Sequence, residues 1–473
     1  MAIALMIGFY TLALVLVAVL LYIPYAEWRY LERVHLQLVL GCLAAAFAVL
    51  AAIVPRPDRF APPGPELDAR THPRLFELVT ELAAATSQEM PRDIYLLADT
   101  NAFVSHRGGV MGISSRRVMG IGLPLLQGLS IQQLRSVIAH EFGHYAGGDV
   151  ALGPWIYKTR AAIGRAIVRL GDGWLAQIFN LYGKLFMRLT MAISRRQEFV
   201  ADEVAARAAG TEAMKSALSQ VAVLAAAHEA YFRHEVVPVL QSGFLPPLAE
   251  GFRHFRTTRA YASHSAALLH HEMTIGETSP FDSHPALRDR IAALDALGLP
   301  SSPGDQASAS TLVDDMEALE REVLAHRAGA DRIAALAVIE WAGVPMAVYQ
   351  PHWVRIVDPH RARLSTMTAG GLPTGPTAYR ALGRALIPKT TIEVTDEECI
   401  GGSIRTLGSA LALRLLALGW TLRGDVGDAL RLHHGNEALE PFTVVSRLAH
   451  GPEGAADWHA EAERLGIAGL PLA

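Results

Sequence analysis

The sequence has 473 residues, of which 51% are hydrophobic and 19% are charged, and its formal net charge is −4. This length is enough for two or three domains, and the apolar share is high for a soluble protein. Because the chain has no excess of basic residues, we expect no nucleic-acid partner. The two cysteines, Cys42 and Cys399, are too few for a disulfide framework and lie in no metal-cluster pattern.

The N-terminus carries two long apolar segments. Residues 1–26 hold no charged side chain, and a second apolar run covers residues 36–54 after a short charged turn. Each run is long enough to cross the hydrocarbon core of a bilayer as a helix, and Trp28 in the turn suits the membrane interface. We therefore expect a transmembrane helical hairpin over residues 1–60. The alternative is a buried helix pair in a soluble core.

The orientation of this hairpin is less sharply defined by the sequence. Arg56 and Arg59 follow the second apolar run, and basic residues recur between positions 158 and 169. For an integral protein of the cell (inner) membrane, this distribution leans toward a cytoplasmic position of the chain that follows the hairpin. The turn also holds Arg29 and Arg33, so the opposite orientation stays open.

The strongest motif is the pentapeptide His140-Glu141-Phe142-Gly143-His144. Ser130 and Gln133 have the spacing of a capping box at the start of an amphipathic helix, which Gly147 and Gly148 would end. Histidines four residues apart leave one helix face and can bind one metal ion, while Glu141 can act on a metal-bound water. The alternative is a pair of helix histidines without a metal.

A third ligand is needed to complete such a site. Position 150, where the metzincin pattern requires histidine, is Val150. Glu198 and Asp202, four residues apart on a later predicted helix, offer a carboxylate ligand and a partner that orients an imidazole. The alternative is an exposed helix on which these carboxylates pair with Arg195 and its neighbour.

Three separated motifs carry a family resemblance: "HEFGHYAGGD", "SRRQEFVAD" and "SHPALRDR". Over residues 66–300 the chain resembles the membrane-bound zinc metallopeptidases of the HtpX and CAAX-prenyl-protease type. The resemblance implies a gluzincin site that binds one zinc ion per chain through His140, His144 and Glu198. It also implies that Glu141 is the general base, in a mainly α (α+β) zincin-like domain with a small β-sheet.

Two further segments acquire a meaning from this resemblance. Asn101-Ala102-Phe103 resembles the edge strand with which such peptidases bind a substrate backbone by β-augmentation, although a loop is equally plausible from the residues alone. In Ser283-His284-Pro285 and the helix that follows, His284 or Arg290 is expected to stabilise the oxyanion. Helix capping and a surface ion pair are the alternative for these two residues.

The remaining regions are less informative. Residues 151–193 are open to three interpretations: further membrane spans, a helix at the membrane surface, or an ordinary core helix. We expect a peptidase domain over residues 61–300, a linker over 301–311, and a small α+β C-terminal domain of unknown role over 312–473. Strands are predicted at 390–395, 419–424 and 442–448.

Together these features predict a membrane-anchored, zinc-dependent endopeptidase that acts on proteins or peptides near the lipid bilayer. Quality control of membrane proteins is one expected role, and processing of a lipid-modified precursor is another. The alternative is a non-catalytic or autoinhibited zincin-fold membrane scaffold that binds partners through its C-terminal domain. The sequence gives no prediction of the oligomeric state.

Overall fold

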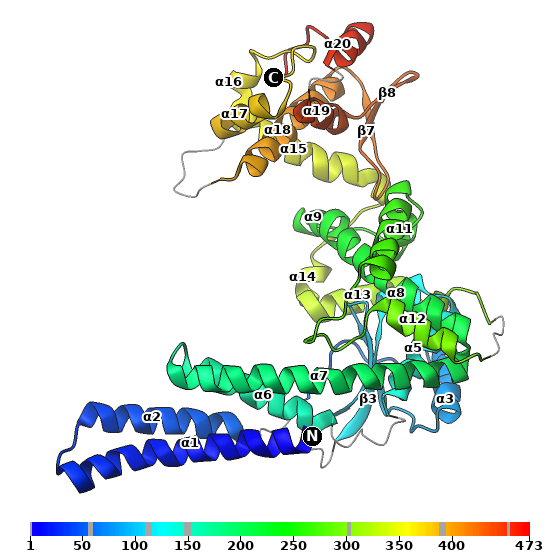
Figure 1. The fold of residues 1–473 in the computed structure, drawn as a ribbon. Coiled ribbons are helices and arrows are strands. Elements are labelled where there is room, and N and C mark those ends of the chain that lie inside the picture. Colours follow the sequence, from blue (N-terminus) through cyan, green and yellow to red (C-terminus); the bar gives the residue numbers. More distant parts are fainter. Residues whose placement is uncertain are drawn as a thin grey trace. The chain divides into compact units, whose positions relative to one another are not determined.

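A computed structural model describes residues 2–54, 60–108, 115–145, 153–299, 304–386, 394–451 and 455–473 (Figure 1). The described chain is mainly helical with small sheets, which confirms the fold class expected from the sequence. It divides into two compact units, one of residues 1–226 and 265–327 and one of residues 227–264 and 328–473. This division is not linear in sequence and differs from the predicted boundary at 301–311.

The N-terminal hairpin consists of α1 (Ala2–Leu31) and α2 (Leu36–Ile53). The two helices pack through small and aromatic side chains such as Phe9, Ala13 and Val49, while other large apolar side chains on both helices are exposed. Exposed apolar surface of this extent suits contact with lipid. Both helices are long and apolar enough to cross a membrane. Arg56 and Arg59, which bear on orientation, lie outside the described residues.

A third helix, α18 (Asp396–Ala417), also has the length and composition of a membrane span. It begins with acidic residues at a capping box formed by Thr395 and Glu398, and it buries polar residues such as Ser403 and Ser409. Leu407, Leu411 and their neighbours on α18 belong to the apolar core of the C-terminal unit. We therefore interpret α18 as the central helix of that unit.

Helices α6 (Gly153–Leu170) and α7 (Trp174–Ala209) extend the hairpin, because α6 and the first half of α7 pack against it. Phe179 of α7 meets Phe9 of α1 with ring centroids 6.0 Å apart. The Arg165 guanidinium of α6 donates to the carbonyl of Ala52 at 2.8 Å. Neither helix is among the described helices that are long and apolar enough to cross a membrane, and the three interpretations of residues 151–193 stay open.

A three-stranded sheet lies in the same unit, with the order β1-β3-β2. Strand β1 (Asp93–Leu97) is parallel to β3 (Arg116–Gly122), and β2 (Ala102–Arg107) is antiparallel to β3. Since β2 pairs only with β3 among the described strands, it forms an edge. Helices α3 (Pro73–Ala85) and α5 (Ile131–Gly143) pack together, and α5 also contacts β2.

Helix α5 packs directly against α7. A Cβ atom built on Gly143 of α5 would lie 2.7 Å from Cα of Ala201 on α7. No side chain fits at that distance, so glycine allows the two backbones to touch. The unit is completed by α4 (Leu123–Gly128), α12 (Leu287–Ala296), η3 (Ala309–Leu312) and α13 (Met316–Ala328). Helices α8 (Thr211–Tyr231) and α11 (Arg259–Thr274) contribute residues to both units.

The C-terminal unit is an α+β structure built around α18. Its short strands β6 (Thr421–Arg423), β7 (Arg431–His434) and β8 (Glu437–Leu439) form an antiparallel sheet, and β4 (Phe244–Leu245) pairs with β5 (Ala337–Val338). Its other elements are η2 (Phe232–Val236), α9 (Val237–Gln241), α10 (Leu248–Phe255), α14 (Ala330–Ala334), η4 (Trp341–Gly343), η5 (Pro345–Tyr349), α15 (Gln350–Val357), η6 (Asp358–His360), α16 (Arg361–Leu364), α17 (Pro376–Leu386), α19 (Pro441–His450) and α20 (Ala455–Arg464).

One predicted strand in this unit is wrong. Residues 442–448 lie in helix α19, not in a strand. Pro441 occupies the first turn, where its fixed φ favours a helix start, and the buried positions Val444, Val445 and Leu448 follow a helical period. The strand predicted at 419–424 is confirmed by β6. Most of the strand predicted at 390–395 lies outside the described residues.

Candidate metal centre

Helix α5 begins as its sequence predicts. The Ser130 hydroxyl accepts a hydrogen bond from the backbone N–H of Gln133 at 3.2 Å, and the Gln133 side chain accepts from the N–H of Ser130 at 2.9 Å. This capping box fixes the start of the helix that carries both motif histidines. The helix ends at Gly143 with His144 as its C-cap. Gly147, Gly148 and Val150 lie outside the described residues.

Both motif histidines face a carboxylate of α7. The Nε2 atom of His140 lies 3.5 Å from one Glu198 oxygen, and the Nε2 atom of His144 lies 3.7 Å from the other. Ligand atoms around a tetrahedral zinc ion are about 3.4 Å apart. The ligating atoms of His140, Glu141 and His144 also lie within 4.8 Å of one another. This donor set therefore fits a metal ion held between α5 and α7.

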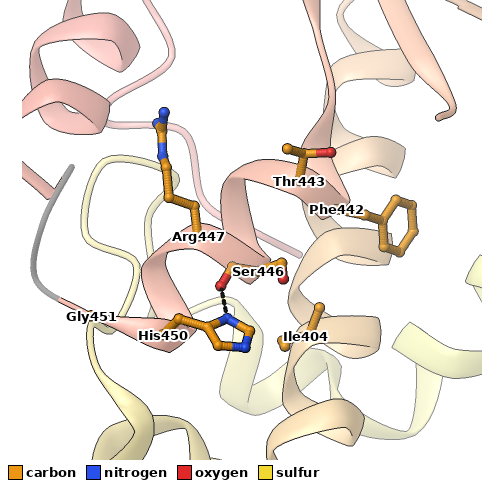
Figure 2. A pocket seen from close by; sticks show the side chains of 7 residues that line it. All are labelled: Ile404, Phe442, Thr443, Ser446, Arg447, His450 and Gly451. Carbon is orange, nitrogen blue, oxygen red and sulfur yellow. Dashed lines mark hydrogen bonds between the residues drawn. The ribbon is translucent and has the colours of Figure 1, made fainter. Parts of the chain in front are cut away.

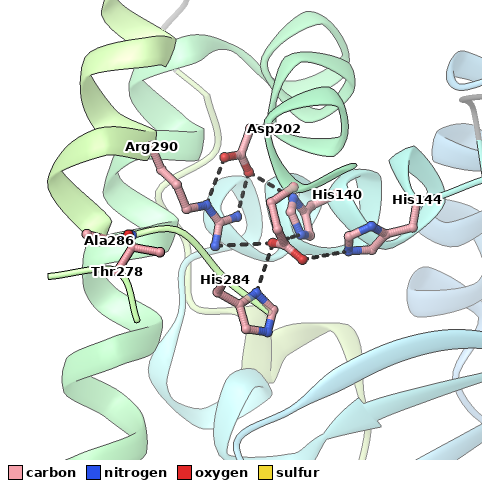
Figure 3. Close-up of polar contacts among 8 residues, drawn as sticks. His140, His144, Asp202, Thr278, His284, Ala286 and Arg290 are labelled. Atoms are coloured by element: carbon pink, nitrogen blue, oxygen red, sulfur yellow. Dashed lines mark hydrogen bonds and ion pairs between the residues drawn. The ribbon is translucent and has the colours of Figure 1, made fainter. Parts of the chain in front are cut away.

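Behind His140 lies Asp202, one helical turn after Glu198 (Figure 3). An Asp202 oxygen lies 2.9 Å from Nδ1 of His140, which leaves Nε2 directed toward Glu198. The guanidinium of Arg290, on α12, donates to both Asp202 oxygens at 2.6 and 2.8 Å. Such carboxylate partners fix the tautomer and orientation of a ligand imidazole. Asp202 thus has the position that the sequence predicts for an orienting residue.

The segment before α12 brings His284 close to the carboxylate of Glu198. Nδ1 of His284 lies 3.0 Å from Glu198, and Nη1 of Arg290 lies 3.5 Å from the same oxygen. This segment is held by Arg195 of α7, whose guanidinium donates to the carbonyl of Asp282 at 2.8 Å. Residues that are far apart in sequence therefore meet around Glu198.

Burial and charge shift the acidities of the groups in this cluster. Burial raises the pKa of Glu141 to about 7, and the Glu198 charge acts in the same direction while the His140 charge opposes it. A carboxylate with such a pKa can accept and release a proton near neutral pH. Burial lowers the pKa of His144 to about 4, with a further contribution from His140. The neutral imidazole is the form that binds metal.

The predicted substrate segment lies at the start of the edge strand. Ala102 and Phe103 open β2, and Asn101 precedes it with its carbonyl accepting from the N–H of Gly122 at 2.7 Å. Phe103 packs beside Gly120 of β3, where a Cβ atom would lie 2.5 Å from the Phe103 ring. The segment is thus part of an edge strand that contacts the helix bearing His140.

The sequence did not predict the structural roles of four residues around this centre. Gly143 permits the contact of α5 with α7, Arg195 holds the segment of His284, and Tyr145 and Arg117 contact β2 and each other. Gly143 stands between the two histidines of the motif, where a small residue is a usable signal for a close helix contact. The other three act through tertiary contacts that leave no local pattern.

A pocket of about 1060 Å³ lies in the C-terminal unit and is distinct from the histidine cluster (Figure 2). Ile404 and Phe442 form part of its wall, and Arg447 and His450 come from the last turn of α19. Basic residues are common in that turn because they complement the helix dipole. A second group, His254 with Asp425 and Asp428, is exposed. We assign the metal centre to the buried cluster around Glu198.

A histidine pair that faces a buried carboxylate is the arrangement that the sequence predicts for a metal site. Residues 69–297 match the family model "Peptidase family M48". The chain is 29% identical over 244 residues to Protease HtpX of Ectopseudomonas mendocina (strain ymp), which is 47% of this chain and 72% of that protein. It is 27% identical to Protease HtpX of Stutzerimonas stutzeri (strain A1501), over 46% of this chain and 71% of the relative.

A Protease HtpX homolog of Burkholderia thailandensis is 26% identical over 48% of this chain and 75% of its own length. No solved structure matches the chain. Over residues 69–297 the chain therefore matches a peptidase family M48 domain and is similar to the membrane metallopeptidases named HtpX. With its apolar hairpin, it is an integral membrane protein.

Proposed function

We propose that this protein is a membrane-anchored, zinc-dependent endopeptidase with His140, His144 and Glu198 as metal ligands. The observation that carries the proposal is the position of Glu198, whose two oxygens face the Nε2 atoms of both motif histidines. Two imidazoles and a carboxylate form a donor set that suits zinc. The similarity to proteins named Protease HtpX agrees with a proteolytic activity.

The chemistry that zinc supplies in such a site is the acidification of water and the polarisation of a carbonyl. In this proposal Glu141 accepts the proton of the attacking water and delivers it to the leaving amine. Burial raises the pKa of Glu141 above the usual range of a carboxyl group, which favours its carrying a proton between the two steps. Asp202 keeps the His140 ring in the orientation that directs Nε2 toward the metal.

Between His284 and Arg290, the structure favours His284 as the donor that stabilises the oxyanion. The guanidinium of Arg290 is buried and occupied by Asp202, so it serves to position the carboxylates. The side chain of His284 is 65% exposed and sits beside Glu198, where a substrate carbonyl can reach it. A preorganised donor of this kind is commonly worth about 10²-fold or more in turnover.

The substrate backbone would lie along β2, beginning at Asn101, Ala102 and Phe103. Main-chain hydrogen bonds to an edge strand recognise an extended segment with little regard to its sequence. This suits unfolded protein segments presented close to the bilayer, as in the quality control of membrane proteins. A location in the inner membrane with the peptidase domain on the cytoplasmic side remains our prediction.

The test is cleavage of an unfolded protein by the detergent-purified full chain, with products identified by mass spectrometry. Wild type should produce internal cleavages, and Glu141→Gln should retain zinc and lose at least about 10²-fold in rate. Glu203→Gln is a matched control, because Glu203 is exposed on α7 and pairs only with Arg207 among the described contacts. Zinc binding without cleavage by wild type would contradict the endopeptidase and favour the scaffold.

A further inference from the structure

Tyr145 connects the end of the metal-binding helix to the edge strand. It directly follows His144, and its hydroxyl donates a hydrogen bond to the carbonyl of Val104 at 2.8 Å. The phenol ring also contacts two other side chains of this unit. The Arg117 guanidinium lies 4.4 Å from its centroid, and the His106 ring lies 5.9 Å away.

Arg117 itself is buried and firmly held. Its guanidinium donates to the carbonyl of Glu89 and to the side chain of Gln88, both at 3.1 Å. A cation over an aromatic face attracts the ring and restricts its motion. Arg117 therefore holds the Tyr145 ring in the position from which its hydroxyl donates to the Val104 carbonyl.

The sheet register shows which way the Val104 carbonyl points. The carbonyl of Asn101 accepts from the N–H of Gly122 at the end of β3, so residue 101 directs its carbonyl toward β3. In an antiparallel pair, alternate residues direct these groups toward the partner strand and away from it. Ala102, Val104 and His106 consequently present their backbone N–H and C=O groups on the open side of β2.

We propose that Tyr145 ends the substrate-binding edge of β2 by occupying the outward carbonyl of Val104. This inference rests on the proposed function. It leaves the N–H and C=O of Ala102 and the N–H of Val104 for a bound segment, and it takes the Val104 carbonyl out of the ladder before His106. The enzyme would then bind short extended segments of a substrate through its backbone. Tyr145 is a specificity-determining residue in this scheme and does not touch the reacting atoms.

The consequence is a limit on how far peptide length increases affinity. In wild type, a peptide that extends as far as Val104 finds its carbonyl already occupied by Tyr145, so the ladder of backbone hydrogen bonds is interrupted there. In Tyr145→Phe the Val104 carbonyl becomes available, and the edge continues toward His106. One added backbone hydrogen bond is commonly worth about 5-fold in affinity. Only peptides long enough to reach Val104 should gain from the substitution.

The experiment measures binding, so it does not depend on turnover. Dye-labelled, nested peptides of valine, serine and threonine are titrated against the zinc-loaded full chain carrying Glu141→Gln in detergent, with and without Tyr145→Phe. Fluorescence anisotropy should show an affinity that stops rising with length when Tyr145 is present. With Tyr145→Phe the longer peptides should bind about 5-fold more tightly, while the shortest should be unchanged.

Tyr231→Phe provides the matched control. The Tyr231 hydroxyl also donates to a backbone carbonyl at 2.8 Å, that of Leu248, but within the C-terminal unit. It should leave the dependence of affinity on peptide length unchanged. The inference is overturned if Tyr145→Phe weakens peptides of all lengths equally, if it leaves the length at which affinity levels off unchanged, or if no peptide binds.

Turnover distinguishes this inference from the function on which it rests. With Glu141 intact, Tyr145→Phe should change KM for long peptides and leave kcat within about 2-fold, as expected when only binding common to ground and transition states changes. A uniform fall in kcat would place Tyr145 at the reacting atoms and overturn the inference. Length-dependent binding without any cleavage would refute the endopeptidase and not the role of Tyr145.

Discussion

Replacing Gly143 by alanine tests whether contact between α5 and α7 sets the geometry of the metal centre. The added Cβ would lie 2.7 Å from Cα of Ala201, 2.9 Å from its carbonyl oxygen and 3.2 Å from its carbonyl carbon. Ordinary contacts begin near 3.4 Å. All three atoms belong to the backbone, so the helices must separate by several tenths of an ångström, because no side chain can rotate away.

The two helices carry opposite sides of the proposed metal site, with His140 and His144 on α5 and Glu198 on α7. Separation would lengthen the distances from the imidazoles to Glu198, which are 3.5 and 3.7 Å. We expect zinc affinity to fall by about 10-fold or more, as for other changes that disturb ligand orientation. Overpacking should cost about 1–3 kcal/mol of folding free energy, partly offset by the higher helix propensity of alanine.

The assay is competition for zinc with a chromophoric chelator, together with thermal unfolding of the metal-free and zinc-loaded protein. Gly402→Ala is the matched control, since the nearest atom to its Cβ is 4.0 Å away on a flexible arginine side chain within α18. It should retain wild-type zinc affinity and gain about 0.5–1 kcal/mol of stability. If Gly143→Ala binds zinc like wild type, the reasoning from helix contact is refuted.

Two other substitutions test the charges and the buried polar groups. Asp202→Asn should lower zinc affinity by about 10–100-fold and destabilise the fold by roughly 3 kcal/mol, because the charge of the buried Arg290 is then poorly compensated. Chelator competition measures the first effect and chemical unfolding the second. A loss of stability of only about 0.5 kcal/mol, as expected for the surface pair of Glu203 and Arg207, would contradict the prediction. Tyr379→Phe should stabilise the C-terminal unit by about 1 kcal/mol, since its buried hydroxyl has no hydrogen-bond partner among the described residues. Burial also raises the pKa of the Tyr379 hydroxyl in the folded state. The protonated hydroxyl therefore costs no additional stability below the unfolded pKa of about 10, but the folded state loses stability as the pH rises above that value. Tyr379→Phe should therefore reduce alkaline unfolding, and an unchanged alkaline transition would refute this.

The metal-binding helix shows how much local sequence can predict. The capping box of Ser130 and Gln133 forms as expected, because each half of it needs only neighbouring residues. The positions of His140 and His144 on one face follow from the helical period alone. The contact of these histidines with Glu198 depends on tertiary structure. The family resemblance implied it, whereas the residue spacing only permitted it.

Other features depend on contacts that local patterns do not encode. The β-branched residues of α19 suggested a strand, but Pro441 at the helix start and burial at helical spacing favour a helix. Helix α6 carries basic residues that argue against a membrane span there. The guanidinium of Arg165 nevertheless donates to a backbone carbonyl at the end of the membrane helix α2. The link from Tyr145 to Val104 joins residues about forty positions apart, and no local periodicity marks it.

The most direct test of the metal centre is the zinc content of the purified full chain and its Glu198→Gln variant after dialysis against a weak chelator. Glu203→Gln, on the same helix and exposed, is the control. We predict one zinc ion per chain in wild type and in the control, and a large loss of zinc in Glu198→Gln. Equal zinc in all three proteins would contradict the assignment of Glu198 as a ligand.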